Sequence, residues 1–206
     1  MSTRRLGVFG GTFDPIHSGH LIAAACVRNA LELDQIIFVP TGHSWHKIPG
    51  PLAPSMDRLA MVDLALADYE NFTSSAVDID RLGPTYTVDT LTDLQAQYAR
   101  EFPEDECTWF FIVGADALAD FPSWKDPEEI LNRAQMVGVS RPGFNVAPGP
   151  LLSGHSIVIE APTPDISSSD IRQRVREGRS LEGLLPIVVA QYIETHGLYR
   201  DTPAGL

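Results

Sequence analysis

The chain has 206 residues, with 27 acidic and 15 basic side chains and a net charge of −12. This length predicts a single domain with one buried core and room for a small helical lobe. The acid excess argues against a broad nucleic-acid-binding surface. No apolar run approaches the ~18 residues that a membrane span needs. The two cysteines form no C-x-x-C pair, so a cytoplasmic protein with reduced thiols is expected.

The stretch GVFGGTFDPIHSGH, residues 7–20, organises the rest of the chain. Arg5 to Phe9 is predicted as a buried strand, and a helix is expected from Ser18 to Leu33. Between them, Gly10-Gly11 lets the backbone turn where a Cβ would hinder it. Such a turn presents backbone N–H groups and the positive end of the helix dipole to one place. The stretch therefore predicts an anion site, most naturally for phosphate.

His17 and His20 distinguish this turn from other phosphate loops. They stand at positions i and i+3 of the first helical turn, so both imidazoles face the same side, and Gly19 between them leaves room for a ligand. The glycine spacing does not match G-x-G-x-x-G, and no G-K-[ST] follows, so neither a dinucleotide fingerprint nor a P-loop is present. An H-x-x-H pair standing alone is more often incidental or part of a metal site.

The run GGTFDPIHSGH resembles the signature of the H-x-G-H nucleotidyltransferases, which adenylylate or cytidylylate small phosphates. The match is closest to the bacterial nicotinate-nucleotide adenylyltransferases, since the related phosphopantetheine adenylyltransferases usually carry Thr in place of His17. The resemblance implies an α/β fold: a Rossmann-like, doubly wound, mainly parallel sheet with helices on both faces. One domain would span residues 1–200, with a small C-terminal helical lobe at about 166–200 and a disordered tail at 201–206.

Apolar runs along the chain agree with alternating strands and crossover helices. Further strands are predicted at 35–40, 72–80, 108–116, 136–140 and 155–160. The run at 108–116 is the most hydrophobic, so it is expected near the centre of the sheet. Helices are predicted at 55–68, from 87 through 98, at 126–133 and at 185–197, with Ser55 and Thr87 as N-caps.

The loop 41–54 follows the second predicted strand and is rich in Gly, Pro and His. In open α/β sheets, ligands bind outside the carboxyl ends of strands, where this loop must lie. The family resemblance implies that Lys47 approaches the phosphates of both substrates and that His46 assists. Arg58, in the helix that follows, is either a plain surface charge or the arginine that the family has in this place.

The segment RLGPTYTVDTL, residues 81–91, resembles the family's G-x-T-Y-T-x-D-T-L block, which contacts the pyridine nucleotide. By its residue types alone, it is a strand break followed by a capped helix start. The resemblance implies that Thr85, Tyr86 and Thr87 bind nicotinate mononucleotide, with Thr85 near the nicotinate carboxylate. Trp124 follows a Pro-Ser turn and would stack on the pyridine ring, although core packing also suits a Trp there.

Other segments are predicted to form the ATP side of the site. Asp116 either accepts ribose hydroxyls or serves only as an acidic residue at a helix start, and Arg141 would border the adenine or the phosphates. The segment ISSSDIR, residues 166–172, resembles the family's I-S-S-T-x-I-R with Ser169 in place of Thr, although serines are ordinary helix caps. The residues assigned to ATP through the resemblance are Gly10, Gly11, Thr12, Phe13, Gly19, Asp116, Arg141, Ile166, Ser167, Ser168 and Ser169.

The resemblance implies adenylyl transfer from ATP to nicotinate mononucleotide, giving nicotinate adenine dinucleotide and pyrophosphate in NAD biosynthesis. His17, His20, Lys47 and Arg172 would be the catalytic residues, and Mg²⁺ bound with ATP would supply countercharge without a metal site of its own. Two alternatives remain: transfer to another small phosphate, such as nicotinamide mononucleotide or phosphopantetheine, and a non-catalytic nucleotide-sensing module. The expected partners are the two small substrates, with a homo-oligomer left open.

Overall fold

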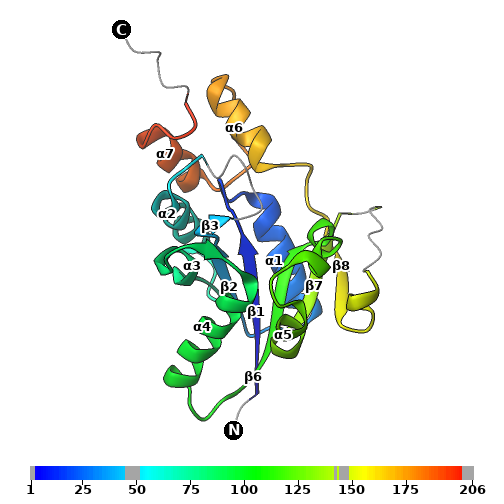
Figure 1. Cartoon of the computed structure of the whole chain (residues 1–206). Coiled ribbons are helices and arrows are strands. Elements are labelled where there is room, and N and C mark those ends of the chain that lie inside the picture. The colour runs from blue at the N-terminus through cyan, green and yellow to red at the C-terminus, as the bar shows by residue number, and fades with distance from the viewer. Residues whose placement is uncertain (1–2, 45–51, 142, 144–148, 201–206) are drawn as a thin grey trace.

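The computed structural model describes residues 3–44, 52–141, 143 and 149–200, and its main sheet has six strands in the order β4-β2-β1-β6-β7-β8 (Figure 1). Every neighbouring pair of strands runs parallel. In sheet order the strands are β4 (Phe72–Ser74), β2 (Gln35–Pro40), β1 (Thr3–Gly11), β6 (Glu106–Gly114), β7 (Gln135–Ser140) and β8 (Ser156–Glu160). The predicted parallel α/β sheet is confirmed, and β6 lies inside it next to β1, as its hydrophobicity predicted.

Helices cover both faces of this sheet (Figure 1). They are α1 (Ser18–Ala30), α2 (Ser55–Leu66), α3 (Val77–Asp80), α4 (Thr87–Glu101), α5 (Pro127–Arg133), α6 (Ser168–Arg176) and α7 (Ile187–Thr195). Apolar residues of α1, α2, α6 and α7 join one core cluster, and those of α3, α4 and α5 join the other. The doubly wound arrangement is therefore confirmed, with α6 and α7 beyond the carboxyl ends of the central strands (Figure 1).

Successive residues of β6 alternate between the two cores. Phe110 and Ile112 pack on the side of α1, whereas Phe111 and Val113 pack on the side of α4. Burying each of these side chains contributes roughly 1.5–3 kcal/mol. Because both faces are buried, the strand has a continuous apolar sequence rather than an alternating one.

The strand predicted at 72–80 is a correction. β4 ends at Ser74, and residues 77–80 form the short helix α3 instead. β4 is an edge strand that pairs with three residues of β2, although β2 itself continues to Pro40. The hydroxyl of Ser75 accepts a hydrogen bond from the Val77 N–H (3.3 Å), a local contact that favours the turn.

The caps predicted for α2 and α4 were wrong by one residue. Pro54 and Tyr86 occupy the N-cap positions, so Ser55 and Thr87 are the first helical residues. Residues 84–85 form β5 (Pro84–Thr85), which pairs in parallel with β3 (His43–Ser44) inside the predicted loop 41–54. This pairing keeps the chain extended up to Tyr86, and α4 begins directly after it.

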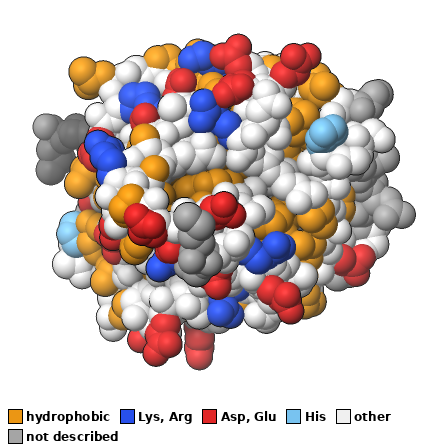
Figure 2. Space-filling model, turned by 90° about the horizontal axis from the view of Figure 1, so that it is seen from below, with side chains coloured by type: hydrophobic (Ala, Val, Ile, Leu, Met, Phe, Trp, Pro, Cys, Tyr) orange, Lys and Arg blue, Asp and Glu red, His pale blue; other side chains and the backbone are white. Residues whose placement is uncertain are grey.

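The surface seen from below the view of Figure 1 carries charges of both signs. Acidic and basic side chains are interspersed on this face, which offers no broad basic area (Figure 2). None of the helices in the described part of the chain has the length and apolar character needed to cross a bilayer. The described residues of this face therefore offer no broad basic site for a large anion. The predicted phosphate site, at residues 10–20, lies instead at the carboxyl edge of the sheet, where β1 ends and α1 begins.

Gly42, between β2 and β3, is a packing point that tolerates no side chain. A Cβ there would stand 2.2 Å from the backbone oxygen of Asp78, which cannot move aside like a flexible side chain. We expect Gly42→Ala to lower the free energy of unfolding by about 3 kcal/mol, measured by urea denaturation. Gly149→Ala is the matched control, because its Cβ would meet nothing within 4 Å. Equal losses in the two variants would contradict this account.

Candidate active site

A cavity of about 800 Å³ opens where β1, β6 and β7 end. Its walls come from residues 9–14 after β1, from the start of α1, from Gly114–Asp116, from residues 139–141 and from the segment that leads into α6. The chain leaves β1 toward one face of the sheet and β6 toward the other, which makes this the switch point where open α/β sheets bind ligands. All of the residues predicted for ATP line this cavity, together with His17, His20 and Arg172.

His17 and His20 stack on one another at the start of α1. Their ring centroids are 3.7 Å apart with an interplanar angle of 26°, so the predicted common orientation is confirmed. The backbone N–H of His17 donates to Nδ1 of His20 (3.2 Å). Because Nδ1 accepts, Nε2 of the neutral His20 ring carries the proton and is a hydrogen-bond donor.

His17 is buried, with only 7% of its surface exposed. Burial, helped by the nearby positive charge of Arg141, lowers its pKa to about 4. The ring is therefore neutral at pH 7, and its side chain caps the first turn of α1 in a capping box with His20.

The turn predicted at Gly10-Gly11 is a correction. Both glycines still belong to β1, where they pair with Val39 and Pro40 of β2, and the chain turns after them, at Phe13, whose φ is 48°. Residues 10–15, which include both glycines and this turn, are called the glycine turn.

The glycines of the motif leave room for neighbouring rings. A Cβ on Gly10 would lie 2.8 Å from the Phe111 ring, and one on Gly11 would lie 2.8 Å from the Phe13 ring. A Cβ on Gly19 would stand 3.0 Å from Nδ1 of His17. Gly19 was expected to make room for a ligand, but in this structure it also gives space to the His17 ring.

Arg58 is the clearest residue that sequence reasoning underrated. It is 1% exposed, so it is not a surface charge. Its guanidinium donates to the carbonyl oxygens of Thr12 (2.7 Å), Thr41 (2.6 Å) and Gly42 (3.3 Å), and burial lowers its pKa. The arginine thereby ties the glycine turn to the end of β2. Its place on the apolar stripe of α2, three and four residues before Met61 and Val62, was the available signal.

The N-terminus of α6 docks on the segment that precedes His17. Ser167 is the N-cap and accepts from the Asp170 N–H (3.1 Å), and the Ser168 hydroxyl donates to the carbonyl oxygen of Pro15 (2.9 Å). Arg172 donates to the carbonyl oxygen of Asp14 (2.7 Å). These contacts bring the two predicted phosphate-binding regions to opposite sides of one cavity.

Asp116 and Arg141 line the other wall. Arg141 forms an ion pair with Asp165 and donates to the carbonyl oxygen of Ile166 (3.4 Å), which joins the end of β7 to the start of α6. Asp116 is exposed, and its carboxylate folds back over Gly114, where a Cβ would lie 2.5 Å from Oδ1. Both residues are placed to meet a ligand, and their assignment to ribose and to adenine or phosphate stays a prediction.

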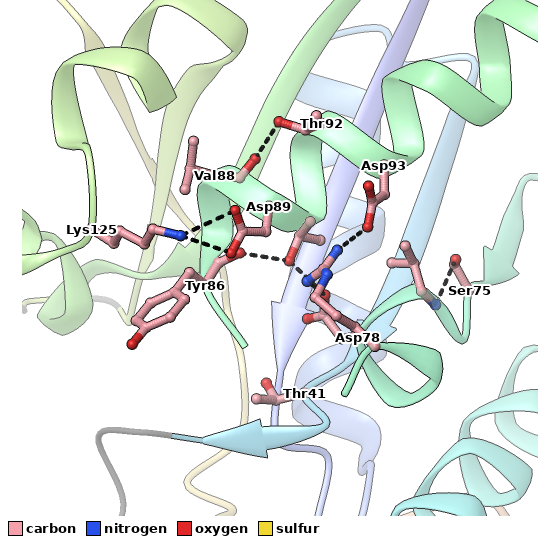
Figure 3. Close-up of polar contacts among 12 residues, drawn as sticks. Thr41, Ser75, Asp78, Tyr86, Val88, Asp89, Thr92, Asp93 and Lys125 are labelled. Carbon is pink, nitrogen blue, oxygen red and sulfur yellow. Dashed lines mark hydrogen bonds and ion pairs between the residues drawn. The ribbon is translucent and has the colours of Figure 1, made fainter. Parts of the chain in front are cut away.

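Four of the five residues predicted for the mononucleotide do not line this cavity. Thr85, Tyr86, Thr87 and Trp124 are not among its lining residues. The first three surround the junction of β5 and α4, where Figure 3 shows the Tyr86 ring near the Lys125 side chain, whose Nζ is 4.7 Å from the ring centroid. Their role in binding remains a prediction.

Trp124 belongs to a group of packed aromatic rings beside β6. Trp124 is half-buried and packs edge-on against Phe111, with centroids 6.3 Å apart, and at a tilt against Phe121. The structure thus gives the indole a packing role, and stacking on a pyridine ring stays a prediction. Lys47 and His46 lie outside the described residues.

A buried carboxylate fixes the start of α4. Asp78 accepts from the hydroxyl of Thr90 (2.6 Å) and forms an ion pair with Arg81, which also pairs with Asp93 (Figure 3). Burial raises the pKa of Asp78 to about 6, with the Thr90 and Arg81 contacts opposing that rise. The Thr90 hydroxyl is also 3.1 Å from the carbonyl oxygen of Tyr86. Asp78 of α3 thus contacts Thr90 in the first turn of α4, next to the segment 85–87.

Comparison with known proteins identifies the class that this fold and site define. A model of the family described as cytidylyltransferase-like matches residues 8–174. The probable nicotinate-nucleotide adenylyltransferase of Acidothermus cellulolyticus is 48% identical over 98% of this chain and 97% of its own length. The corresponding protein of Saccharopolyspora erythraea is 48% identical over 98% and 94%. The chain belongs to the cytidylyltransferase-like family and, within it, to the family of these nicotinate-nucleotide adenylyltransferases.

Solved structures share the fold at lower sequence identity. The Plasmodium falciparum nicotinic acid mononucleotide adenylyltransferase complexed with NaAD aligns with a TM-score of 0.72 and 19% identity, over 95% of this chain and 97% of that one. A putative nicotinate-nucleotide adenylyltransferase from Vibrio parahaemolyticus aligns with a TM-score of 0.67 and 20% identity, over 97% of each chain. The Rossmann-like architecture is confirmed by these likenesses.

The burial of neutral His17 should appear in the pH dependence of stability. Its folded-state pKa of about 4 lies below the ordinary 6.5, so the unfolded chain binds more protons between these values. The stabilisation should be complete above pH 6.5 and fall by up to about 3 kcal/mol as the pH drops toward 4. In urea unfolding at several pH values, His17→Gln should lose less stability over this range. Parallel curves for the two proteins would contradict the expected shift.

Proposed function

We propose that this chain transfers the adenylyl group of ATP to nicotinate mononucleotide, forming nicotinate adenine dinucleotide and pyrophosphate in NAD biosynthesis. The observation that carries the proposal is the one cavity that the glycine turn, the His17–His20 pair and Arg172 line together. Relatives named as probable nicotinate-nucleotide adenylyltransferases match nearly the whole chain and support the choice of substrates. Both substrates are small and water-soluble, which fits the predicted cytoplasmic location.

The reaction needs positioning more than it needs acid–base groups. A phosphate oxygen of nicotinate mononucleotide forms a bond to the α-phosphorus of ATP. The bond from that phosphorus to the oxygen bridging to the β-phosphorus breaks, and its electron pair leaves with pyrophosphate. A phosphate monoester is largely ionised at neutral pH, because its second pKa is about 6. The protein must therefore align two anions and stabilise the charge that develops on the α- and β-phosphates.

The donors around the cavity divide this task. His20 donates through Nε2 to the α-phosphate, since its Nδ1 is occupied by the His17 N–H, and His17 positions the phosphates from the same helical turn. The N-terminus of α6 and the guanidinium of Arg172 hold the triphosphate from the other side. Lys47 is assigned to the phosphates of both substrates by the family resemblance.

The nicotinate end is assigned to the start of α4 and to Trp124. The Thr85 hydroxyl is buried and has no hydrogen-bond partner among the described residues, and the family resemblance assigns it to the nicotinate carboxylate. A helix N-terminus favours a small anion in the same place. Tyr86 and Thr87 complete this contact, and the exposed part of Trp124 stacks on the pyridine ring.

Mg²⁺ fits this site as an ion that arrives with ATP. No group of three or more His, Cys, Asp or Glu side chains in the described part of the chain could hold a metal ion by itself. Mg²⁺ in nucleotide sites is commonly held by substrate phosphates and one or two carboxylates, and Asp116 is an exposed carboxylate on the cavity wall. When bound, the ion supplies countercharge to the triphosphate.

Pyrophosphate release distinguishes this function from its alternatives. With ATP and Mg²⁺, the protein should release pyrophosphate with nicotinate mononucleotide faster than with nicotinamide mononucleotide or phosphopantetheine, and excess EDTA should stop the release until Mg²⁺ is restored. Faster turnover with another acceptor would reassign the substrate. ATP binding without turnover on any acceptor would instead favour a nucleotide-sensing module.

His20→Ala tests the assignment of the histidine pair. If His20 acts mainly on the transition state, kcat should fall by about 10²–10⁴-fold while the KM for ATP changes little. Steady-state pyrophosphate release measures both constants. The control is His155→Ala, an exposed histidine that does not line the cavity. A loss confined to KM would mean that the pair only binds ATP.

A further inference from the structure

Tyr199 connects the C-terminal end of the described chain to the floor of the cavity. It follows α7 and is 9% exposed. Its hydroxyl donates to Oδ1 of Asp14 at 2.8 Å, across 185 positions of the sequence. Burial, followed by the adjacent Asp14 carboxylate, raises the pKa of Tyr199 far above its ordinary value. The phenol therefore stays protonated, and remains a donor, near neutral pH.

Asp14 receives this hydrogen bond as one of several. Its carboxylate is 4% exposed and also accepts from the backbone N–H groups of Leu52 (2.9 Å) and Ala53 (3.1 Å). Within the described residues, the Tyr199 hydroxyl is the only side chain that donates a hydrogen bond to this carboxylate. Loss of that hydroxyl would leave a buried carboxylate with fewer donors, and this costs more free energy than the loss of an exposed hydrogen bond.

Asp14 in turn sets the position of Arg172. Nη1 of Arg172 donates to the carbonyl oxygen of Asp14 (2.7 Å) and lies 3.7 Å from its carboxylate, while Nη2 donates to the Ser169 hydroxyl (3.0 Å). Arg172 lines the cavity. The hydrogen bond uses the backbone of Asp14, so a change in the orientation of the Asp14 carboxylate would act on the guanidinium through the 3.7 Å contact.

We propose that Tyr199 is a positioning residue of the active site: its phenol fixes the Asp14 carboxylate, and Asp14 thereby fixes the Arg172 guanidinium at the cavity. This inference rests on the proposed function, because that function places the triphosphate of ATP against Arg172. The C-terminal segment after α7 would then contribute to ATP binding, although Tyr199 itself does not line the cavity.

A second tyrosine of the same region provides a matched control. Tyr192, on α7, donates through its hydroxyl to Oδ1 of Asp57 on α2 (2.9 Å). This is also a phenol–carboxylate hydrogen bond that anchors the C-terminal helix, but neither residue lines the cavity. If the C-terminal segment acts only as a structural anchor, removing either phenol hydroxyl should leave the affinity for ATP unchanged.

The experiment compares Tyr199→Phe with Tyr192→Phe in the full chain. Each variant loses one hydroxyl and keeps its ring. Calorimetry with ATP alone measures the equilibrium affinity, and pyrophosphate release measures kcat and KM. We expect Tyr199→Phe to weaken ATP binding by about tenfold and to raise the KM for ATP, whereas Tyr192→Phe should stay within about twofold of the wild type. Thermal melting should show the larger stability loss in Tyr199→Phe, because its hydroxyl bonds a buried carboxylate, so ATP binding is measured well below the melting temperature of both variants.

A double-mutant cycle tests the route through Arg172. If Tyr199 acts through this arginine, adding Tyr199→Phe to Arg172→Lys should weaken ATP binding much less than it does in the wild type. Asp14→Asn, which keeps the side-chain shape, serves in the same cycle if Tyr199→Phe does not fold.

Two results would overturn the inference: an unchanged ATP affinity in Tyr199→Phe, or full additivity with Arg172→Lys. The proposed function fails separately, through a wild-type protein that binds ATP but transfers its adenylyl group to no acceptor. In that case the calorimetric comparison still decides the role of Tyr199.

Discussion

The buried charges behind the glycine turn constrain the rest of the site. An ion removed from water costs several kcal/mol unless its hydrogen bonds are satisfied, and here the Arg58 guanidinium and the Asp14 carboxylate are both almost fully buried. Arg58 donates to three backbone carbonyl oxygens, and Asp14 accepts from two backbone N–H groups and a phenol. These contacts favour one conformation of residues 12–14, because losing any of them would leave part of a buried charge unpaired, as the Nε of Arg58 already is among the described residues. The His17–His20 pair begins directly after this fixed segment.

The order of the strands explains why the cavity forms beside that segment. β1 and β6 are neighbours, yet the elements that follow them pack on opposite faces of the sheet. The space between the two departing segments is open at the carboxyl edge, and the N-termini of α1 and α6 both border it. In a chain with a net charge of −12, the overall field does not attract a polyanion. Attraction must come from local groups, which are the two helix ends and the cavity-lining Arg141 and Arg172.

The sequence predicted the sheet well because the information is local. Continuous apolar runs such as β6 identify doubly covered parallel strands, and the family resemblance of the glycine–histidine and serine–arginine motifs indicated both walls of the cavity. The failed strand at 72–80 has partial alternation, but only tertiary pairing determines that β4 stops after three residues. Likewise, the place of Arg58 on the apolar stripe of α2 indicates that it is buried but not which groups it contacts, and nothing near the C-terminus indicates that Tyr199 meets the same segment. Contacts between distant segments are not encoded in any local pattern, so the partners of these two residues could be found only from the fold.

The neutral state of His17 shows how burial and anion recognition oppose each other at one side chain. A charged imidazole would attract a phosphate more strongly, but in the buried position of His17 the charged form is disfavoured by desolvation, and Arg141 adds to that effect. The positive charge of the site is therefore carried by arginines, which do not lose their protons near neutral pH. The imidazoles contribute directed N–H donors instead. His20 illustrates this division, because the hydrogen bond to its Nδ1 leaves Nε2 as the donor. Directional donors of this kind are suited to charge that shifts between phosphate oxygens during transfer, while fixed cations hold the charge that is present throughout.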